Sequence, residues 1–131
     1  MKTIVRSGKA WERSIRFSPA VRIEPCALVV TSGLVGRGED GAIVPGGMAA
    51  QARQTFENLR QVLSAAGAGM GDIVKLNYYV TDMSQWEDVA RARAEVLSEP
   101  LPASATVEVS RLYDPDCLVE IEAIAAIPAA K

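Results

Sequence analysis

The sequence contains no histidine, and this absence excludes several kinds of active site. Histidine is the usual general base near neutral pH and the commonest metal ligand in proteins. Nucleophilic sites that pair a serine or a cysteine with a histidine are therefore excluded. The two cysteines, Cys26 and Cys117, are far apart and form no CxxC pair. We therefore expect no metal site.

The sequence also has little that would place it in a membrane or outside the cell. The first residues, MKTIVRSGKAWERS, lack the apolar core of a signal peptide. The longest apolar runs, 27–30 and 123–130, are too short to span a bilayer. We expect a cytoplasmic protein without membrane association, whose cysteines are buried or interfacial thiols and not a disulfide.

Neither sign of charge dominates. The 14 basic and 16 acidic residues give a net charge of −2, and no window holds five or six like charges. A nucleic-acid partner is therefore not expected. Hydrophobic residues make up 49% and charged residues 23% of the chain, as in average globular proteins. The 131 residues have room for a single domain, 1–131, with a sizeable core.

Hydrophobic periodicity predicts two helices. Apolar residues recur at steps of three and four over 48–66, and Gly67 follows as a stop signal. A second helix is predicted to begin near Ser84, because Ser84-Gln-Trp-Glu87 matches a capping box, and to stop before Pro100. Alternation or β-branched composition predicts strands over 26–35, 42–44, 73–81, 105–110 and 118–125. Phe56, Tyr78 and Trp86 lie on apolar faces and are expected in the core.

This order of elements predicts an α+β fold in which two helices cover one face of a sheet. The uncovered face would carry Leu118 and Ile124 beside Glu120 and Glu122. Such a face is too apolar to be left in water and too charged for a dry core. Burial against other subunits, with the carboxylates lining a cleft, would satisfy both requirements, so we predict a ring-shaped homo-oligomer.

Six segments occur in an order and spacing that resemble a known family. They are FSPAV at 17–21, TSG at 31–33, QARQTFENL at 51–59, AAG at 65–67, GDIVK at 71–75 and LVEIEAIA at 118–125. Together they resemble the RidA/YjgF family, also called the reactive intermediate deaminase or L-PSP endoribonuclease family, over nearly the whole chain. The resemblance implies a chorismate-mutase-like fold and a homotrimer with three clefts between subunits. It also implies hydrolysis of reactive enamines and imines to 2-oxo acids and ammonia, without a metal or organic cofactor.

The resemblance assigns a catalytic role to Glu120, at the family position that orients and activates the attacking water. Ser32 and Gly33 match the cleft-lining turn and are expected to bind substrate. Without the resemblance, Glu120 would be interpreted as an ordinary surface carboxylate. Glu122, on the same face, is expected to form an intersubunit salt bridge.

Other positions depart from the family pattern. Ser104 replaces the arginine that clamps the substrate carboxylate, and Thr106 replaces a frequent cysteine. Phe17 corresponds to the cleft tyrosine, and Ala90 to an asparagine of the second helix. All four are expected to line the substrate-binding cleft. Because an arginine fork makes two charge-assisted hydrogen bonds and Ser104 carries no charge, the cleft is expected to disfavour small anionic imino acids.

Several alternatives remain open at this point. Arg91 or Arg93 would replace the missing clamp if either side chain reached the cleft. The leading interpretation is a homotrimeric hydrolase of C=N bonds that acts on a substrate other than the usual small 2-imino acids. The alternative is a non-catalytic trimer that binds a small metabolite or a partner protein in the same clefts. A ribonuclease role is the least supported, because the net charge is negative, aromatic residues are few and histidine is absent.

Overall fold

A computed structural model describes residues 2–24 and 26–129. Within these residues the helices are α1 (Gly47–Ala65) and α2 (Trp86–Val96). The strands are β1 (Lys2–Val5), β2 (Ala20–Ile23), β3 (Cys26–Val30), β4 (Ile73–Val80), β5 (Ala103–Glu108) and β6 (Val119–Pro128). Short 3-10 turns, η1 (Ala10–Arg13), η2 (Met70–Asp72) and η3 (Met83–Gln85), lie between them.

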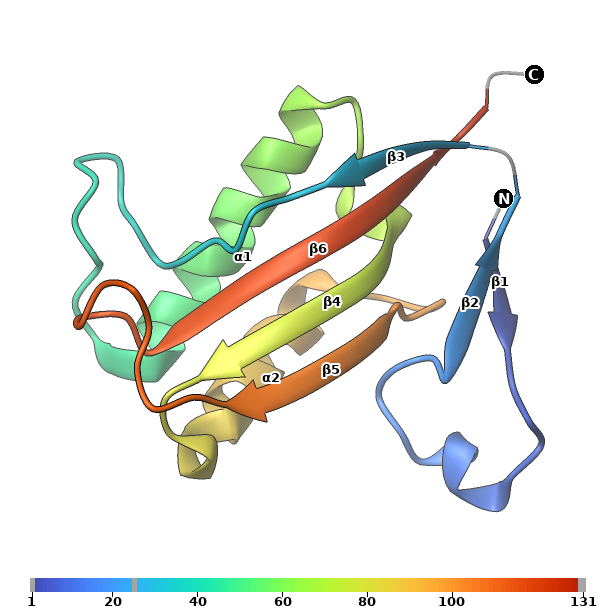
Figure 1. Cartoon of the computed structure of the whole chain (residues 1–131), viewed down its shortest axis with the longest axis horizontal. Coiled ribbons are helices and arrows are strands. Elements are labelled where there is room, and N and C mark those ends of the chain that lie inside the picture. The colour runs from blue at the N-terminus through green and yellow to red at the C-terminus, as the bar shows by residue number, and fades with distance from the viewer. Residues whose placement is uncertain (1, 25, 130–131) are drawn as a thin grey trace.

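The main sheet has the strand order β3-β6-β4-β5, and both helices lie behind it in Figure 1. Strand β6 pairs antiparallel with β3 and with β4, whereas β4 and β5 pair in parallel. Strands β1 and β2 form a separate antiparallel pair beside this sheet. The predicted α+β fold, with two helices on one face of a mixed sheet, is confirmed.

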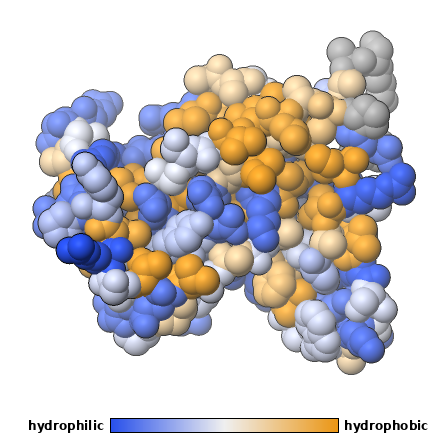
Figure 2. All heavy atoms as spheres, in the orientation of Figure 1, coloured by the Kyte–Doolittle hydropathy of each residue, from blue (hydrophilic) through white to orange (hydrophobic). Residues whose placement is uncertain are grey.

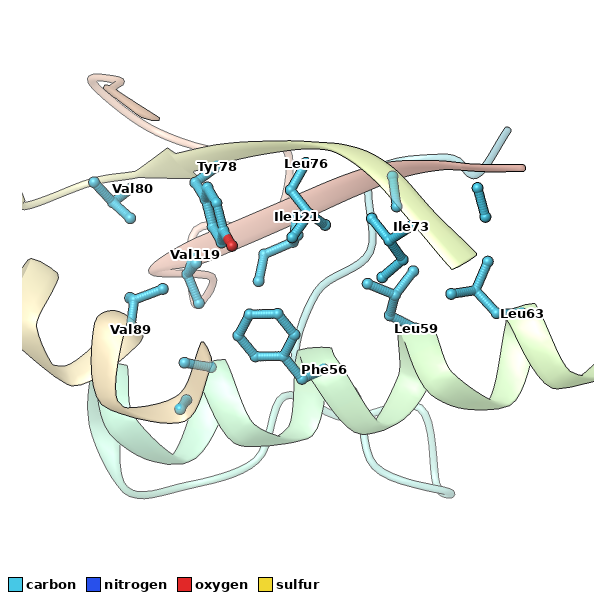
Figure 3. Close-up of a cluster of buried hydrophobic side chains, with 14 of the residues drawn as sticks. Phe56, Leu59, Leu63, Ile73, Leu76, Tyr78, Val80, Val89, Val119 and Ile121 are labelled. Carbon is cyan, nitrogen blue, oxygen red and sulfur yellow. The ribbon is translucent and has the colours of Figure 1, made fainter. Parts of the chain in front are cut away.

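The core lies between the sheet and the two helices (Figure 3). Phe56 of α1 points towards Tyr78 of β4 and Ile121 of β6, and Leu59 of α1 points towards Ile73 of β4. Each of these five residues is at most 1% exposed. The Tyr78 ring packs edge-on against Phe56 and against Trp86 at the start of α2, with centroid distances of 6.4 and 5.1 Å. The alternate residues of β4 and β6 therefore point away from the helices, onto an open face of the sheet.

The two helices differ in how well their ends were predicted. Helix α1 ends as expected, because Gly67 has a φ of +81° and its N–H donates to the carbonyl of Ser64. The capping box expected at Ser84 does not form. Instead, Asp82 caps η3, because its carboxylate accepts hydrogen bonds from the N–H and the hydroxyl of Ser84. Helix α2 begins two residues after Ser84, at Trp86.

The N-terminal and central strands also differ from the prediction. No strand was predicted before residue 26, yet β1 and β2 form a hairpin there. The strand expected over 26–35 ends at Val30, and 42–44 contributes only a single bridge between Arg37 and Ile43. Leu118, predicted to begin the last strand, precedes β6, and its partly buried side chain packs against the core.

Candidate functional site

The chain bends immediately after β3, and hydrogen bonds on both sides of the bend attach it to β6. Before the bend, the Thr31 N–H donates to the Ala123 carbonyl (2.9 Å), and the Ala123 N–H donates to Thr31 Oγ1 (3.0 Å). After it, Leu34 and Ile121 exchange N–H to carbonyl bonds of 2.8 and 2.9 Å. Residues 32 and 33 are therefore held over the middle of β6.

Gly33 at this bend lies directly against the side chain of Glu120. A Cβ atom at position 33 would lie 2.6 Å from Glu120 Cδ and 2.9 Å from its Oε1. Only glycine leaves room for the carboxylate in this position. Ser32 is exposed at the same bend. The structure thus brings together three of the residues predicted to form the site, Ser32, Gly33 and Glu120.

A second group of polar side chains shares the open face with Glu120. Residues Asn77 and Tyr79 of β4 are opposite Glu122 and Glu120 of β6. The Tyr79 hydroxyl and the Asn77 amide both donate to Glu122 Oε1, at 2.7 and 3.0 Å. Glu122 therefore accepts hydrogen bonds from two neutral donors, whereas no side-chain hydrogen bond to Glu120 is found among the described residues.

The surroundings of Glu120 change its acidity. Partial burial raises the pKa of the Glu120 carboxyl above its ordinary value, and the nearby charge of Glu122 raises it further. Glu122 also raises the pKa of Tyr79, so the phenol stays protonated and remains a donor. A carboxylate with a raised pKa is a stronger base than an ordinary surface glutamate, which suits it to accept a proton from water.

A buried amide fixes the segment that enters β6. The Gln51 side chain on α1 is 4% exposed, donates to the Asp116 carbonyl (3.0 Å) and accepts the Leu118 N–H (2.8 Å). The backbone just before Glu120 is therefore tied to the long helix on the other side of the sheet.

The open face combines this polar group with exposed apolar side chains (Figure 2). Leu28 and Val30 of β3 are 56% and 70% exposed, and Val107 of β5 is 46% exposed. Hydrophobic residues gather over β3 and the adjoining part of β6, while hydrophilic residues cross the middle of the sheet. This face has the mixed character expected for it from the sequence.

The remaining predicted residues line two adjoining pockets on the helix side of the molecule. A pocket of about 340 Å³ is lined by Phe17, Ser104 and Thr106 together with Arg16, Trp86 and Arg93. A wider pocket of about 590 Å³ shares Arg16, Trp86 and Arg93 with it and contains Ala90 and Arg91. The two pockets therefore lie side by side along α2, and we call them together the α2 depression.

Within one chain, these pockets and Glu120 lie on opposite sides of the sheet. Thr106 is paired with Tyr78, whose side chain points to the helices, whereas Glu120 is paired with Tyr79, which points to the open face. The predicted residues thus form two separate groups, Ser32, Gly33 and Glu120 on the open face, and Phe17, Ala90, Ser104 and Thr106 along α2.

The structure adds residues that the sequence analysis did not assign to a site. Asn77 and Tyr79 lie within the strand predicted over 73–81, but nothing in the sequence showed that they donate hydrogen bonds to Glu122. Trp86 packs on the core as expected, and it also lines both pockets. Arg16 was missed because it precedes the FSPAV segment and carries no signal of its own.

No group of three His, Cys, Asp or Glu side chains within 2–24 and 26–129 is placed to hold a metal ion. Both cysteines are free thiols, and burial raises the pKa of Cys117, so this thiol is not activated. No helix in the described part of the chain is both long and apolar enough to cross a bilayer.

Comparison with known proteins identifies similar chains over most of the sequence. The family model described as Endoribonuclease L-PSP matches residues 8–127. A RutC family protein of Pyrococcus horikoshii is 44% identical over 85 residues, which cover 65% of this chain and 67% of that protein. The 2-iminobutanoate/2-iminopropanoate deaminase of Escherichia coli K12 is 38% identical over 101 residues, 75% of this chain and 78% of the enzyme.

The fold is also shared with solved structures. The crystal structure of YyfB of Yersinia pestis, a protein of unknown function in the Rid family, superposes with a TM-score of 0.86. It is 27% identical and covers 96% of this chain and 98% of its own. The sequence segments, the two-helix mixed sheet and these matches agree, and the chain belongs to the endoribonuclease L-PSP family, which is the RidA/YjgF family that the sequence resembles.

Proposed function

We propose that this protein hydrolyses C=N bonds of enamine or imine substrates in clefts between the subunits of a homotrimer, with Glu120 as the catalytic residue and without a metal or organic cofactor. The observation that carries the proposal is the placement of Glu120 against Gly33, on an open sheet face, with a raised pKa. The E. coli relative named as an imine deaminase supports the reaction class.

In the proposed reaction, Glu120 accepts a proton from water while the water oxygen bonds to the imine carbon. That proton passes from Glu120 to the nitrogen, which gives a carbinolamine. Glu120 then transfers the hydroxyl proton of this intermediate to the amino nitrogen as the C–N bond breaks, so that ammonia leaves and the carbonyl forms. Water and the imine thus give a ketone or 2-oxo acid and ammonia, with no change in oxidation state. Because its pKa is raised, the Glu120 carboxylate is a stronger base towards water than an ordinary glutamate.

The homotrimer supports this function because one chain carries two incomplete halves of the expected site. The open face exposes Leu28, Val30 and Val107 around the carboxylates, which is unfavourable for a monomer in water. A neighbouring subunit that covers this face with its α2 depression would bring Ser104 and Thr106 of one chain to Glu120 of the other. Each cleft would then contain all the predicted residues.

The substrate is proposed to be larger than the usual small 2-imino acids. Ser104 leaves space where the family has an arginine, and the pocket beside it continues past Ala90 into the wider depression of about 590 Å³. A substrate with a bulky apolar part would fill this volume, whereas a two- or three-carbon imino acid would leave it empty.

The test measures the decay of two imines generated in place by an amino acid oxidase with catalase, one from phenylalanine and one from 2-aminobutanoate. We expect the protein to accelerate ammonia release, more for the phenylalanine imine, and Glu120→Gln to lose about a hundredfold or more of the rate. Unchanged turnover in Glu120→Gln would refute the mechanism. Ligand-dependent thermal stabilisation without turnover of either imine would favour the non-catalytic binding alternative.

A further inference from the structure

The pocket around Ser104 carries positive charge although its strand carries no arginine. Arg93 comes from α2 and Arg16 from the segment before β2, and no acidic residue lines this pocket of about 340 Å³. The two hydroxyl-bearing residues Ser104 and Thr106 and the aromatic residues Phe17 and Trp86 complete the lining.

Arg93 is held in place by aromatic residues rather than by a carboxylate. Its guanidinium carbon lies 5.5 Å from the centre of the Trp86 ring, at cation–π distance. The Arg93 charge also lies close enough to Tyr78 to oppose the larger effect of burial, which raises the pKa of that phenol. Among the described residues, neither Arg93 nor Arg16 takes part in an ion pair. The Arg93 guanidinium thus lies against an aromatic ring, and no ion pair neutralises its charge among the described residues.

The wider adjoining pocket has a different charge balance. It shares Arg16 and Arg93 with the narrow pocket, but Glu87 and Glu99 also line it, and its third arginine, Arg91, forms an ion pair with Asp88 at 3.5 Å. Arg16 and Arg93 lie at the boundary of both pockets, and only on the narrow side do they face a lining without carboxylates. The wider one offers Ala90, Ala94, Leu97 and Leu101 as apolar lining.

We propose that Arg93, assisted by Arg16, binds the carboxylate of the substrate in the narrow pocket, and that the apolar part of the substrate extends into the wider pocket beside Ala90. A planar guanidinium makes paired, charge-assisted hydrogen bonds to a carboxylate, and the Ser104 and Thr106 hydroxyls are further donors. The ligand class is a 2-oxo or 2-imino acid with a bulky apolar side chain. This inference rests on the proposed function for the reaction, but it concerns binding and is tested without turnover.

The experiment titrates three probes by calorimetry: phenylpyruvate, phenylacetone, which replaces the carboxylate by a methyl group, and pyruvate, which lacks the phenyl ring. We expect phenylpyruvate to bind about tenfold or more tightly than either of the others. Arg93→Gln is expected to weaken phenylpyruvate binding about tenfold or more and to leave phenylacetone binding unchanged. Arg16→Gln should have a smaller effect in the same direction.

Two further variants distinguish the loss of the pocket charge from an effect of the substitution on folding. Arg111→Gln removes the same charge from an exposed residue outside the pocket and is expected to leave binding unchanged. The double variant Arg93→Gln with Ser104→Arg returns a guanidinium to the same pocket and should restore phenylpyruvate binding. Melting temperatures without ligand show whether each variant is folded.

The outcomes distinguish this inference from the proposed function. Equal phenylpyruvate affinity in the wild type and Arg93→Gln would overturn the carboxylate assignment, whatever the turnover. Equal affinity for pyruvate and phenylpyruvate would overturn the assignment of the wider pocket. Arg93-dependent binding without imine hydrolysis would leave the inference standing and refute the catalytic proposal.

Discussion

At the residue scale, the acidity of Glu120 depends on its neighbour two positions along β6. Successive residues on one face of a strand are about 7 Å apart, so the two carboxylates on this face interact electrostatically. Burial and the Glu122 charge both raise the pKa of Glu120. If the ionised form of Glu120 is the base, the rate falls as the pH drops through this raised pKa.

Replacing Glu122 by glutamine should therefore shift the pH profile. Glu122→Gln removes the like charge, which lowers the pKa of Glu120 towards its ordinary value and extends full activity to lower pH. The measurement is kcat/KM for imine hydrolysis against pH, with Glu39→Gln, on an exposed turn, as a control of equal charge change. An acid limb that stays in place, or that moves equally in both variants, would contradict the electrostatic role of Glu122.

Single residues of the candidate site were predictable to very different degrees. Glu120 and Gly33 lie in segments of specific order and spacing, so sequence comparison could find them. The contact between them could not be predicted, because it depends on how the chain folds back over β6. Arg93 was only an open alternative, since helical spacing does not tell which side chain lies on Trp86.

At the element scale, the bend after β3 shows why the predicted strand 26–35 was too long. Leu34 and Val35 resume the apolar pattern of the strand after Thr31, Ser32 and Gly33, so the prediction extended the strand across these three residues. The strand ends because Thr31 Oγ1 takes the Ala123 N–H that a continued ladder would have used. The helices and central strands, by contrast, carry long periodic patterns, and their positions were predicted correctly.

The bend predicts an effect of Gly33→Ala on activity rather than on stability. The added methyl group would collide with the Glu120 side chain, which is flexible and can turn away. We expect turnover to fall about tenfold or more, by loss of an oriented base, while the melting temperature changes little. Imine hydrolysis and thermal melts measure the two quantities.

Two other glycines provide matched controls for this variant. The Cβ added by Gly71→Ala would have no atom within 4 Å, so this variant should change neither the turnover nor the melting temperature. Gly36→Ala would place a Cβ 2.9 Å from the backbone Cα of Gln51, so it should lower the melting temperature. A Gly33→Ala protein that loses stability as Gly36→Ala does, or that keeps full activity, would refute the role of the bend.

At the scale of the whole molecule, we expect the open face to form the subunit interface. Val30 is 70% exposed in the chain and lies beside Ile124 of β6 on the proposed interface. Val30→Glu would bury an unpaired charge in a trimer and should therefore shift the protein towards monomers. Sedimentation equilibrium is expected to give three times the chain mass for the wild type and a lower mass for the variant.

The control for assembly lies on the other side of the molecule. Val62 of α1 is 43% exposed. Val62→Glu makes the same change of charge and size as Val30→Glu, and it should leave the trimer and its activity intact. Loss of imine hydrolysis in Val30→Glu alone would agree with clefts completed by a second subunit. A wild type of monomer mass at micromolar concentration would contradict the assembly.

The position of Trp86 gives the protein an intrinsic optical reporter. Its indole lies under Arg93 and lines both pockets, and the other tryptophan, Trp11, is 56% exposed. Because the chain has only these two tryptophans, Trp11→Phe leaves Trp86 as the sole indole fluorophore. A carboxylate that draws the guanidinium from the ring would alter the emission of Trp86, so that occupancy and its kinetics become measurable by stopped-flow fluorescence without a label.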